Sequence, residues 1–210
     1  MASEAAAKPQ TRIQREKTEA ILEAALDVFS SQGFRGATLD EIADAAGMSK
    51  PNLLYYFPSK EAIHDQLLAD LLEVWLDPLR EMNPDGEPLD EICAYVGRKL
   101  ALAQSAPRES RLFANEVVRG AVRIRRFLEC ELKTLVDEKA ALIRGWGAAG
   151  RMAVVDPYHL IFSIWSTTQH YADFDAQVCA VLGSREDGRF DDATAFLCQM
   201  YRDGLAPGRG

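Results

Sequence analysis

The sequence predicts an all-α protein with two parts: an N-terminal three-helix head that contains a helix-turn-helix, and a C-terminal helical body. Apolar residues recur at helical spacing along most of the chain, glycine and proline punctuate these stretches, and we find no convincing strand. We expect a disordered N-terminal arm over 1–11, the head over 12–75 and the body over 76–206. At 210 residues the chain has ample apolar content for such cores.

The first two helices of the head have recognisable starts and stops. One apolar stripe predicts a helix from Arg12 to Gln32, which Gly33 ends. A second helix begins at Thr38, because Glu41 follows three residues later and the two form a capping box. Gly47 ends this helix in a left-handed conformation that only glycine enters cheaply. The apolar stripe of the first helix consists of Ile21, Leu22, Ala25, Leu26 and Phe29.

A short helix follows within three residues of the glycine turn. Ser49 is its expected cap and Pro51 lies in its first turn, where a missing N–H costs little. Phe57 ends it, because Pro58 disfavours helical geometry in the residue before it. Ser59 caps the next helix. Two short helices joined by a tight turn form the geometry that places the second helix in the major groove of DNA.

The outer side of this short helix has residue types that suit DNA. Leu53, with Phe57, is expected to face inward, which leaves the polar residues outside. Lysine reaches phosphates or guanine, asparagine pairs with adenine, and tyrosine bonds phosphates or touches thymine methyl groups. The alternative is that the tyrosines only pack at the rim and the lysine is an ordinary solvated charge. The candidate DNA-binding residues are Thr38, Ser49, Lys50, Asn52, Leu53, Tyr55, Tyr56 and Lys60.

The formal net charge of −8, taken alone, argues against nucleic-acid binding. Residues 8–62 hold seven basic and eight acidic side chains, however, and residues 63–210 account for −6 of the total. Four of the seven basic side chains lie within 8–17. A nearly neutral head with a basic arm can bind DNA as a dimer, with an affinity that falls steeply as salt rises.

Other features of the sequence predict a soluble cytoplasmic protein. The four cysteines are widely spaced and lie in apolar helical contexts, which favours buried, reduced thiols. The first ten residues lack the apolar core of a signal peptide. No apolar run approaches the roughly 18 residues that cross a membrane. The cysteines are Cys93, Cys130, Cys179 and Cys198.

The body is expected to be a series of helices. A long helix runs from Lys60 to about Arg80, and a turn at Asn83-Pro84-Asp85-Gly86 follows as a plausible seam between head and body. Further helices are expected over about 88–105, 108–118, 121–149, 157–181 and 191–204. The helices over 157–181 and 191–204 have more apolar surface than one small body can bury, which favours a dimer.

The strongest candidate ligand site lies in the helix over 157–181. Trp165 and Gln169 are four residues apart on one face, with Phe162 one turn earlier. An indole beside an amide suits a small planar ligand, because the ring stacks while the amide pairs with an N–H and a C=O together. The alternative is that these aromatic residues form core or dimer interface.

The segment around the short helix resembles the recognition segment of the TetR family of bacterial repressors. The matching residues are Gly47, Met48, Ser49, Lys50, Leu53, Tyr55, Phe57, Ser59, Lys60 and Glu61. Pro51, Asn52 and Leu54 depart from the family pattern. The resemblance implies a DNA-binding regulator, mostly a repressor, that binds a palindromic double-stranded operator. It also implies a homodimer formed by the last two helices, a small-molecule effector, no cofactor and no membrane association.

Most of the chain also resembles the branch of pyrimidine-utilisation regulators within this family. Asn52 to Ala62, Ser110 to Phe113, and Thr168 to Phe174 are among the matching segments. This implies uracil or thymine as the effector that weakens operator binding and thereby controls pyrimidine metabolism genes. The segment over 115–126 differs from the branch. The candidate ligand-binding residues are Trp75, Phe113, Asn115, Trp165 and Gln169.

Two alternatives remain. A regulator of the same type could sense a different small or hydrophobic ligand through an altered pocket. More remotely, Glu61 and His64 form a Glu-x-x-His string of the kind found in metal-dependent helical-bundle enzymes. Such a site needs a second string and two further glutamates, whereas Glu61 suits the first turn of a helix because of the helix dipole. We therefore expect no metal site and no enzymatic activity.

Overall fold

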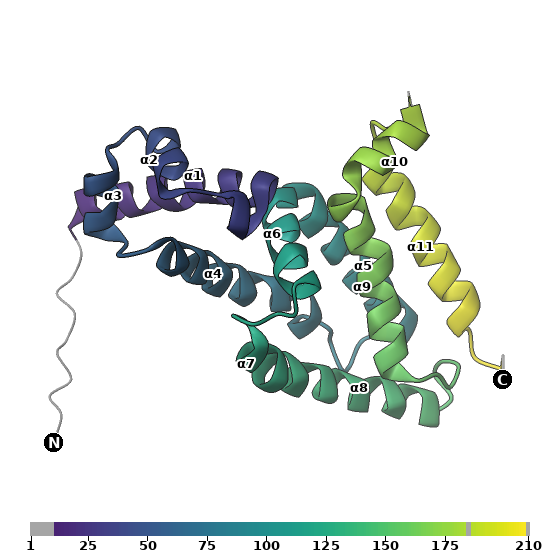
Figure 1. The fold of residues 1–210 in the computed structure, drawn as a ribbon. Helices are drawn as coiled ribbons and strands as arrows, with labels where there is room; N and C mark the ends of the chain where they lie inside the picture. The colour runs from purple at the N-terminus through teal and green to yellow at the C-terminus, as the bar shows by residue number, and fades with distance from the viewer. Residues whose placement is uncertain (1–10, 184–185, 209–210) are drawn as a thin grey trace, which may run out of the picture. The chain divides into compact units, whose positions relative to one another are not determined.

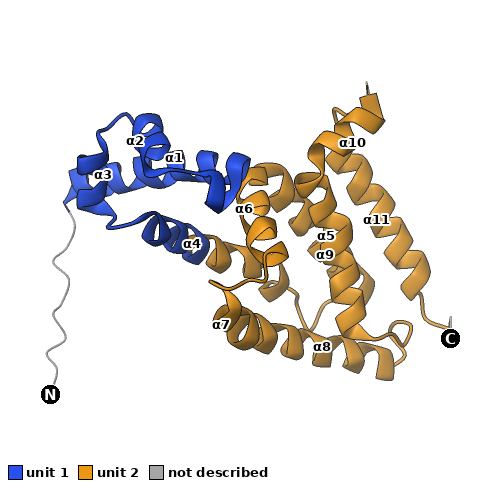
Figure 2. Cartoon of the chain, in the orientation of Figure 1, with its two compact units in different colours: residues 1–69 blue, residues 70–210 orange. Residues whose placement is uncertain are grey.

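The computed structural model describes residues 11–183 and 186–208, and every regular element in them is helical (Figure 1). The chain divides into two compact units that meet between Ala69 and Asp70, within one long helix (Figure 2). The predicted all-α fold is therefore confirmed. The arm expected over 1–11 lies outside the described residues, apart from Thr11. Within the described residues, none of the helices has the combination of length and apolar character that crossing a bilayer requires.

Unit 1 contains α1 (Arg12–Gly36), α2 (Leu39–Ala45), α3 (Lys50–Tyr56) and the first half of α4 (Lys60–Arg80). Each helix contributes apolar side chains to one small core, which explains why the short α2 and α3 can form at all. Helices this short depend on tertiary packing, because nucleating a helix costs more free energy than a few backbone hydrogen bonds contribute. The residues of this core with no exposed surface are Ile21, Ala25, Phe29, Ile42, Leu53 and Ile63.

The start and the end of α2 are as the sequence predicts. The Thr38 hydroxyl accepts a hydrogen bond from the backbone N–H of Glu41 at 3.2 Å, and the Glu41 carboxylate accepts one from the Thr38 N–H at 2.9 Å. The Thr38 hydroxyl also donates to the Glu41 carboxylate at 2.8 Å, and this bond, followed by that from the Thr38 N–H, lowers the pKa of Glu41 below its usual value. Gly47 has φ +64°, and the N–H groups of Gly47 and Met48 bond back to Asp44 and Ala43. Both ends of α2 are thus satisfied by local contacts.

Two features of the head differ in detail from the prediction. The stop expected at Gly33 is present as a break, because its φ of 69° and ψ of 168° are not helical, but helical turns resume beyond it, so that α1 runs to Gly36. The side chain of Ser49 makes no capping hydrogen bond, although the residue occupies the cap position of α3. The proline at Pro51 explains this in part, because a cap bonds the second or third N–H of its helix and Pro51 has none.

Unit 2 begins with the second half of α4, and its described residues add seven α-helices and one π-helical turn, η1. Helix α5 packs against both α9 and α11, while α6 and α8 also pack on α9, so α5 and α9 form the centre of the unit (Figure 1). The core of the unit includes buried side chains from α4, α5, α8, α9 and α11. The elements are α5 (Pro88–Ser105), α6 (Pro107–Val118), α7 (Arg125–Phe127), η1 (Leu128–Leu132), α8 (Lys133–Ala148), α9 (Pro157–Asp173), α10 (Asp175–Leu182) and α11 (Arg189–Leu205).

Two of the expected helices in the body are interrupted. The helix expected over 121–149 begins only at Arg125 and contains η1 before α8 continues it. Ala121 causes the late start, because its φ of +54° follows that of +99° at Gly120 and neither is helical. The helix expected over 157–181 breaks at Phe174, with φ −115° and ψ 29°. Neither break involves a proline, so the apolar pattern alone could not reveal them.

Candidate DNA-binding surface and ligand cavity

Helix α3 presents polar and aromatic side chains on its outer side. Lys50, Asn52 and Tyr55 are exposed, and Tyr55 has 72% of its surface accessible. Leu53 is fully buried, so it anchors the helix and has no surface to offer a nucleotide. The structure therefore gives Leu53 a supporting position, as its inward direction predicted, rather than a place on the contact surface.

The exposed residues of α3 make few contacts within the protein. The Lys50 ammonium lies 2.9 Å from the Asp40 carboxylate in an ion pair whose two side chains are both well exposed. The rings of Tyr55 and Tyr56 meet edge to face with centroids 5.2 Å apart. An exposed ion pair contributes little to stability, so a phosphate can compete with Asp40 for Lys50 at small cost.

Two other candidate residues are hydrogen-bonded within the head. The Lys60 ammonium donates to the backbone carbonyls of Phe34 and Ala37, at 2.8 and 2.7 Å, and lies 4.5 Å from the centre of the Phe34 ring. Phe34 lies in the last turn of α1 and Ala37 is its C-cap residue, and helix ends lack intrahelical partners for their carbonyls. Thr38 is held by its capping bonds to Glu41. Both residues therefore form hydrogen bonds that stabilise the head, a role that the sequence motif did not indicate.

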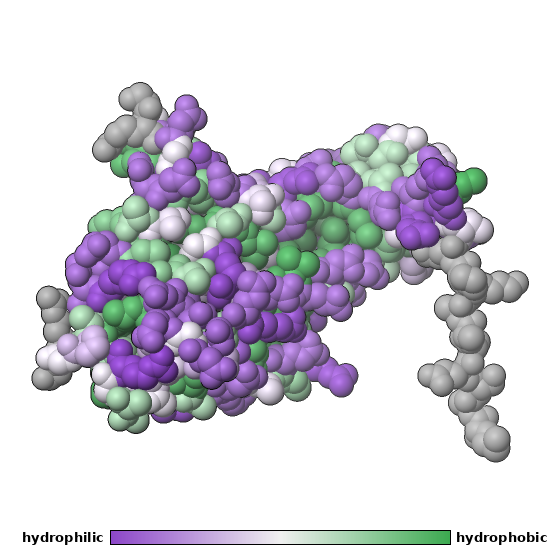
Figure 3. Space-filling model, turned by 180° about the vertical axis from the view of Figure 1, so that it is seen from behind, coloured by the Kyte–Doolittle hydropathy of each residue, from purple (hydrophilic) through white to green (hydrophobic). Residues whose placement is uncertain are grey.

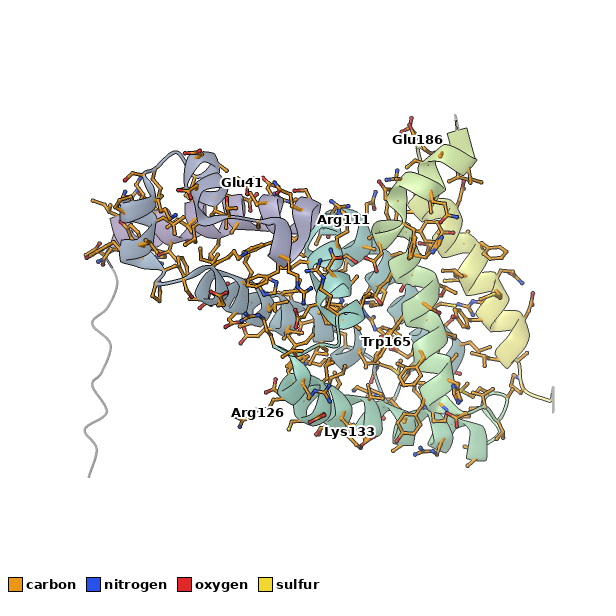
Figure 4. All side chains as sticks on the ribbon, in the orientation of Figure 1. Glu41, Arg111, Arg126, Lys133, Trp165 and Glu186 are labelled. Carbon is orange, nitrogen blue, oxygen red and sulfur yellow. The ribbon has the colours of Figure 1, made fainter. Side chains whose placement is uncertain are left out.

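Unit 2 contains a cavity of about 50 Å³ that brings together most of the candidate ligand-binding residues. Trp75 enters it from α4, Phe113 from α6, and Trp165 with Gln169 from α9; Figure 4 labels Trp165 on this helix. Asn115 does not line the cavity, so its assignment to this site is not supported by the geometry. The other lining residues are Leu72, Leu76, Leu79, Tyr95, Lys99, Phe127 and Leu132.

The cavity wall includes the irregular part of the chain. Phe127 is the last residue of α7 and Leu132 the last of η1, and both line the cavity. A π-helical turn adds one residue to the repeat and thereby changes which side chains face inward. Both residues follow the divergent segment over 115–126, and no residue of that segment lines the cavity.

Two polar lining residues, Tyr95 and Lys99, were missed by the sequence analysis. They lie four residues apart on the buried face of α5, where Lys99 keeps only 4% of its surface exposed. The signal that could have found them is the position of a lysine on the apolar stripe of Ile92 and Val96. A lysine at such a position is either paired or functional.

The polar groups of the cavity have unusual surroundings. The Trp165 indole N–H donates to the Tyr95 hydroxyl at 2.6 Å, whereas the indole N–H of Trp75 is buried without a partner among the described residues. The ammonium of Lys99 lies 5.0 Å from the centre of the Trp75 ring. Burial lowers the pKa of Lys99 to about 8, against a smaller opposing effect of the Asp173 carboxylate. Burial likewise raises the pKa of Tyr95, which therefore keeps its proton.

The Glu-x-x-His string does not form part of a metal site. His64 is buried, and its ring centre lies 5.0 Å from that of Phe29 and 4.8 Å from that of Phe34. Within the described ranges 11–183 and 186–208, no three His, Cys, Asp or Glu side chains are grouped so that they could hold a metal ion. His64 is accordingly a packing residue of the head.

Comparison with solved structures places the fold among bacterial regulators. The structure of transcriptional regulator SCO4942 from Streptomyces coelicolor superposes with a TM-score of 0.67 at 21% identity, over 90% of this chain and 98% of that one. The structure of AibR in complex with isovaleryl coenzyme A and operator DNA superposes with a TM-score of 0.61 at 20% identity, over 74% and 85% of the two chains. At these identities the likeness concerns the fold.

Sequence comparison is more specific. Residues 21–67 match the family model of bacterial regulatory proteins of the tetR family, and residues 68–208 match that of the YcdC-like protein C-terminal region. The HTH-type transcriptional regulator RutR of Escherichia coli K12 is 47% identical over 193 residues, which are 91% of each chain. The boundary between the two models lies two residues from the boundary between the two units. The chain therefore belongs to the TetR family of DNA-binding transcriptional regulators, in which it is similar to RutR.

Proposed function

We propose that this regulator binds a palindromic operator as a homodimer, mostly as a repressor of pyrimidine metabolism genes, and that uracil or thymine in the unit 2 cavity releases the DNA. The observation that supports the effector most directly is the convergence of Trp75, Trp165 and Gln169 on one cavity. These are the residues to which the resemblance to pyrimidine-utilisation regulators assigns ligand binding.

The chemistry of the cavity suits a pyrimidine base. Aromatic and aliphatic side chains form most of its lining, and the Gln169 amide can pair with a ring N–H and its neighbouring C=O. Uracil has about eight heavy atoms, and the best small ligands gain roughly 1.5 kcal/mol per atom. Micromolar affinity is therefore within reach.

For operator contact, the proposal assigns α3 to the major groove. Lys50, Asn52 and Tyr55 are the residues that we propose to reach bases or phosphates, with Ser49 and Tyr56 at the edges of the same surface. In a two-fold dimer the two recognition helices must be about 34 Å apart to enter successive major grooves. A ligand that changes this spacing with a coupling of roughly 1–3 kcal/mol would alter operator affinity about 5- to 150-fold.

The proposed dimer uses the last two helices. Large apolar side chains are exposed there: 76% of Val181 on α10, and 66% of Phe196 with 41% of Met200 on α11. Hydrophobic residues also interrupt the hydrophilic surface on the face seen in Figure 3. Phe196→Glu should give a monomer that has lost specific operator binding, as measured by light scattering and gel shift. Val154→Glu, at a residue 83% exposed outside these helices, is the matched control.

The effector assignment is tested by fluorescence anisotropy with the DNA upstream of the regulator's own gene. Uracil or thymine should weaken binding, and Gln169→Leu should remove this response without changing affinity for DNA alone. Gln104→Leu, at an exposed residue of α5 outside the cavity, is the control. Failure of every pyrimidine at millimolar concentration to shift the melting temperature or the operator affinity would refute the assignment.

The second candidate function is a repressor of the same kind that senses another small or hydrophobic ligand. The apolar character of most of the lining favours this alternative, since leucine and phenylalanine side chains accept many ring systems. A thermal-shift series that compares pyrimidines with unrelated aromatic compounds separates the two.

A further inference from the structure

The polar groups of the cavity do not match a neutral pyrimidine, and we propose that Lys99 makes the cavity bind its effector as a ring monoanion, formed by loss of one ring N–H proton. This inference rests on the proposed pyrimidine effector and adds the ionic form in which it is recognised. The negative charge of the ligand would be placed against the Lys99 ammonium, and the proton would pass to the buffer.

The side chains that line the cavity offer a ligand more hydrogen-bond donors than acceptors. Among the side chains that line the cavity, Lys99, the Trp75 indole, the Tyr95 hydroxyl and the Gln169 amide can each donate to a ligand. The Tyr95 oxygen already accepts from Trp165, so its own hydrogen is left for another acceptor. The Gln169 carbonyl oxygen remains as the side-chain acceptor of the cavity. Donors thus clearly outnumber acceptors.

Neutral uracil and its monoanion differ in the hydrogen-bond donors and acceptors that they present to these side chains. Neutral uracil has two ring N–H donors and two carbonyl acceptors, so one N–H would be buried without an acceptor. The monoanion has one N–H, which Gln169 can accept, and three acceptor atoms for the surplus donors. A buried polar group without a hydrogen-bond partner costs as much free energy as several good contacts contribute. The ionised ring is therefore the better match for the side chains of the cavity.

Lys99 is a buried cationic side chain at the cavity wall. Its ammonium has no hydrogen-bond acceptor and no ion-pair partner within the described residues, although only 4% of its surface is exposed. No carboxylate lines the cavity. A buried cation without a counter-ion is costly, and an anionic ligand would remove that cost and gain a charge-assisted hydrogen bond.

The groups around Lys99 leave its charge available to a ligand. Helix α4 contributes the Trp75 ring and α5 contributes Tyr95, which stays neutral. Asp173 of α9 is the nearby carboxylate, but its Oδ1 accepts the Ser110 hydroxyl hydrogen bond from α6 at 2.5 Å. Burial raises the pKa of Asp173 against the effects of Lys99, Arg111 and His170. Asp173 therefore moderates the field at Lys99 without pairing with it.

The decisive measurement is the number of protons released on binding. Calorimetry at pH 7.0 in buffers of different ionisation enthalpy should show release of about one proton per uracil bound, because Lys99 is already charged and the ring must ionise. 5-Fluorouracil has nearly the same shape but a more acidic N–H. It should bind about tenfold tighter for each unit by which its N–H pKa lies below that of uracil.

The pH dependence follows from the same two groups. Below the Lys99 pKa of about 8, the affinity for uracil should rise about tenfold per pH unit, because the anionic fraction of the ligand grows while Lys99 stays charged. Above that pKa the affinity should level off, since Lys99 loses its charge as the ligand gains its own.

Variants at Lys99 distinguish this inference from a merely structural role. Lys99→Met keeps the apolar stem and should bind uracil and 5-fluorouracil equally, with no proton release. Lys99→Arg keeps the charge and should retain the preference for 5-fluorouracil. Equal affinity of the wild-type protein for both ligands, without proton release, would overturn the inference while leaving the pyrimidine proposal intact. Absence of binding by both would overturn the pyrimidine proposal itself.

Discussion

The indole N–H of Trp165 donates a hydrogen bond to the hydroxyl of Tyr95 over 2.6 Å, and this bond joins α9 to α5 at the wall of the cavity. Tyr95 is among the largest fully buried side chains of the protein, whereas Trp165 is half-buried. The bond fixes the plane of the Trp165 ring and uses its only donor. Trp165 can therefore offer a ligand its ring face but not its N–H.

Removal of the Tyr95 hydroxyl should show how much the hydrogen bond between Trp165 and Tyr95 stabilises the protein. We expect Tyr95→Phe to lower the free energy of unfolding by about 1–2 kcal/mol, because the Trp165 N–H loses its acceptor in a partly buried place. Urea unfolding followed by tryptophan fluorescence measures the change. Tyr55→Phe, at a tyrosine 72% exposed, should stay within about 0.5 kcal/mol. Equal changes in the free energy of unfolding for the two substitutions would show that the hydrogen bond between Trp165 and Tyr95 does not stabilise the protein.

Lys50 should contribute to operator binding mainly through charge. Lys50→Gln is expected to weaken operator binding and to reduce the slope of log K against log salt by about one per half-site, since one phosphate contact is lost. Gel shifts at several salt concentrations provide the slope. The control is Lys133→Gln, at an exposed lysine of α8 that is paired with Asp137, and it should leave the slope of log K against log salt unchanged. An unaltered slope for the Lys50 variant would place that residue outside the interface.

Lys60 should matter for the stability of the head. Lys60→Met removes two hydrogen bonds from a charged donor to the last turn and the C-cap residue of α1, and we expect the free energy of unfolding to fall by about 2–3 kcal/mol. A melting curve measures this loss. Weaker operator binding with an unchanged melting temperature would instead show that Lys60 contacts DNA, as its place in the recognition motif suggests.

The thiol of Cys93 should react slowly. Burial first, and then the neighbouring Cys198, raise the pKa of Cys93 to about 11. The thiolate is the reactive form, so alkylation at pH 8 should be about 100-fold slower than for a thiol whose pKa is two units lower. Mass spectrometry after a timed iodoacetamide pulse should find Cys130, which is exposed, modified before Cys93. The opposite order would contradict this account.

The order of helices and turns in the head was predictable because its signals are local. The capping box of Thr38 and Glu41, and the positive φ of Gly47, depend on residues within one helical turn, and both were confirmed. The bonds of Lys60 to Phe34 and Ala37 were not predictable, because they join positions more than 20 residues apart in the chain.

In the body, the sequence by itself determined the helical pattern and the aromatic and amide groups on α9. Only the tertiary structure decided that Trp75, Phe113, Trp165 and Gln169 share one cavity, that Asn115 lies outside it, and that a lysine belongs to its wall. The physical reason is that helical periodicity fixes which side of a helix is apolar but not which helix covers it. Whether a buried lysine is paired depends on what the other helices bring to it, and in this cavity they bring hydrogen-bond donors.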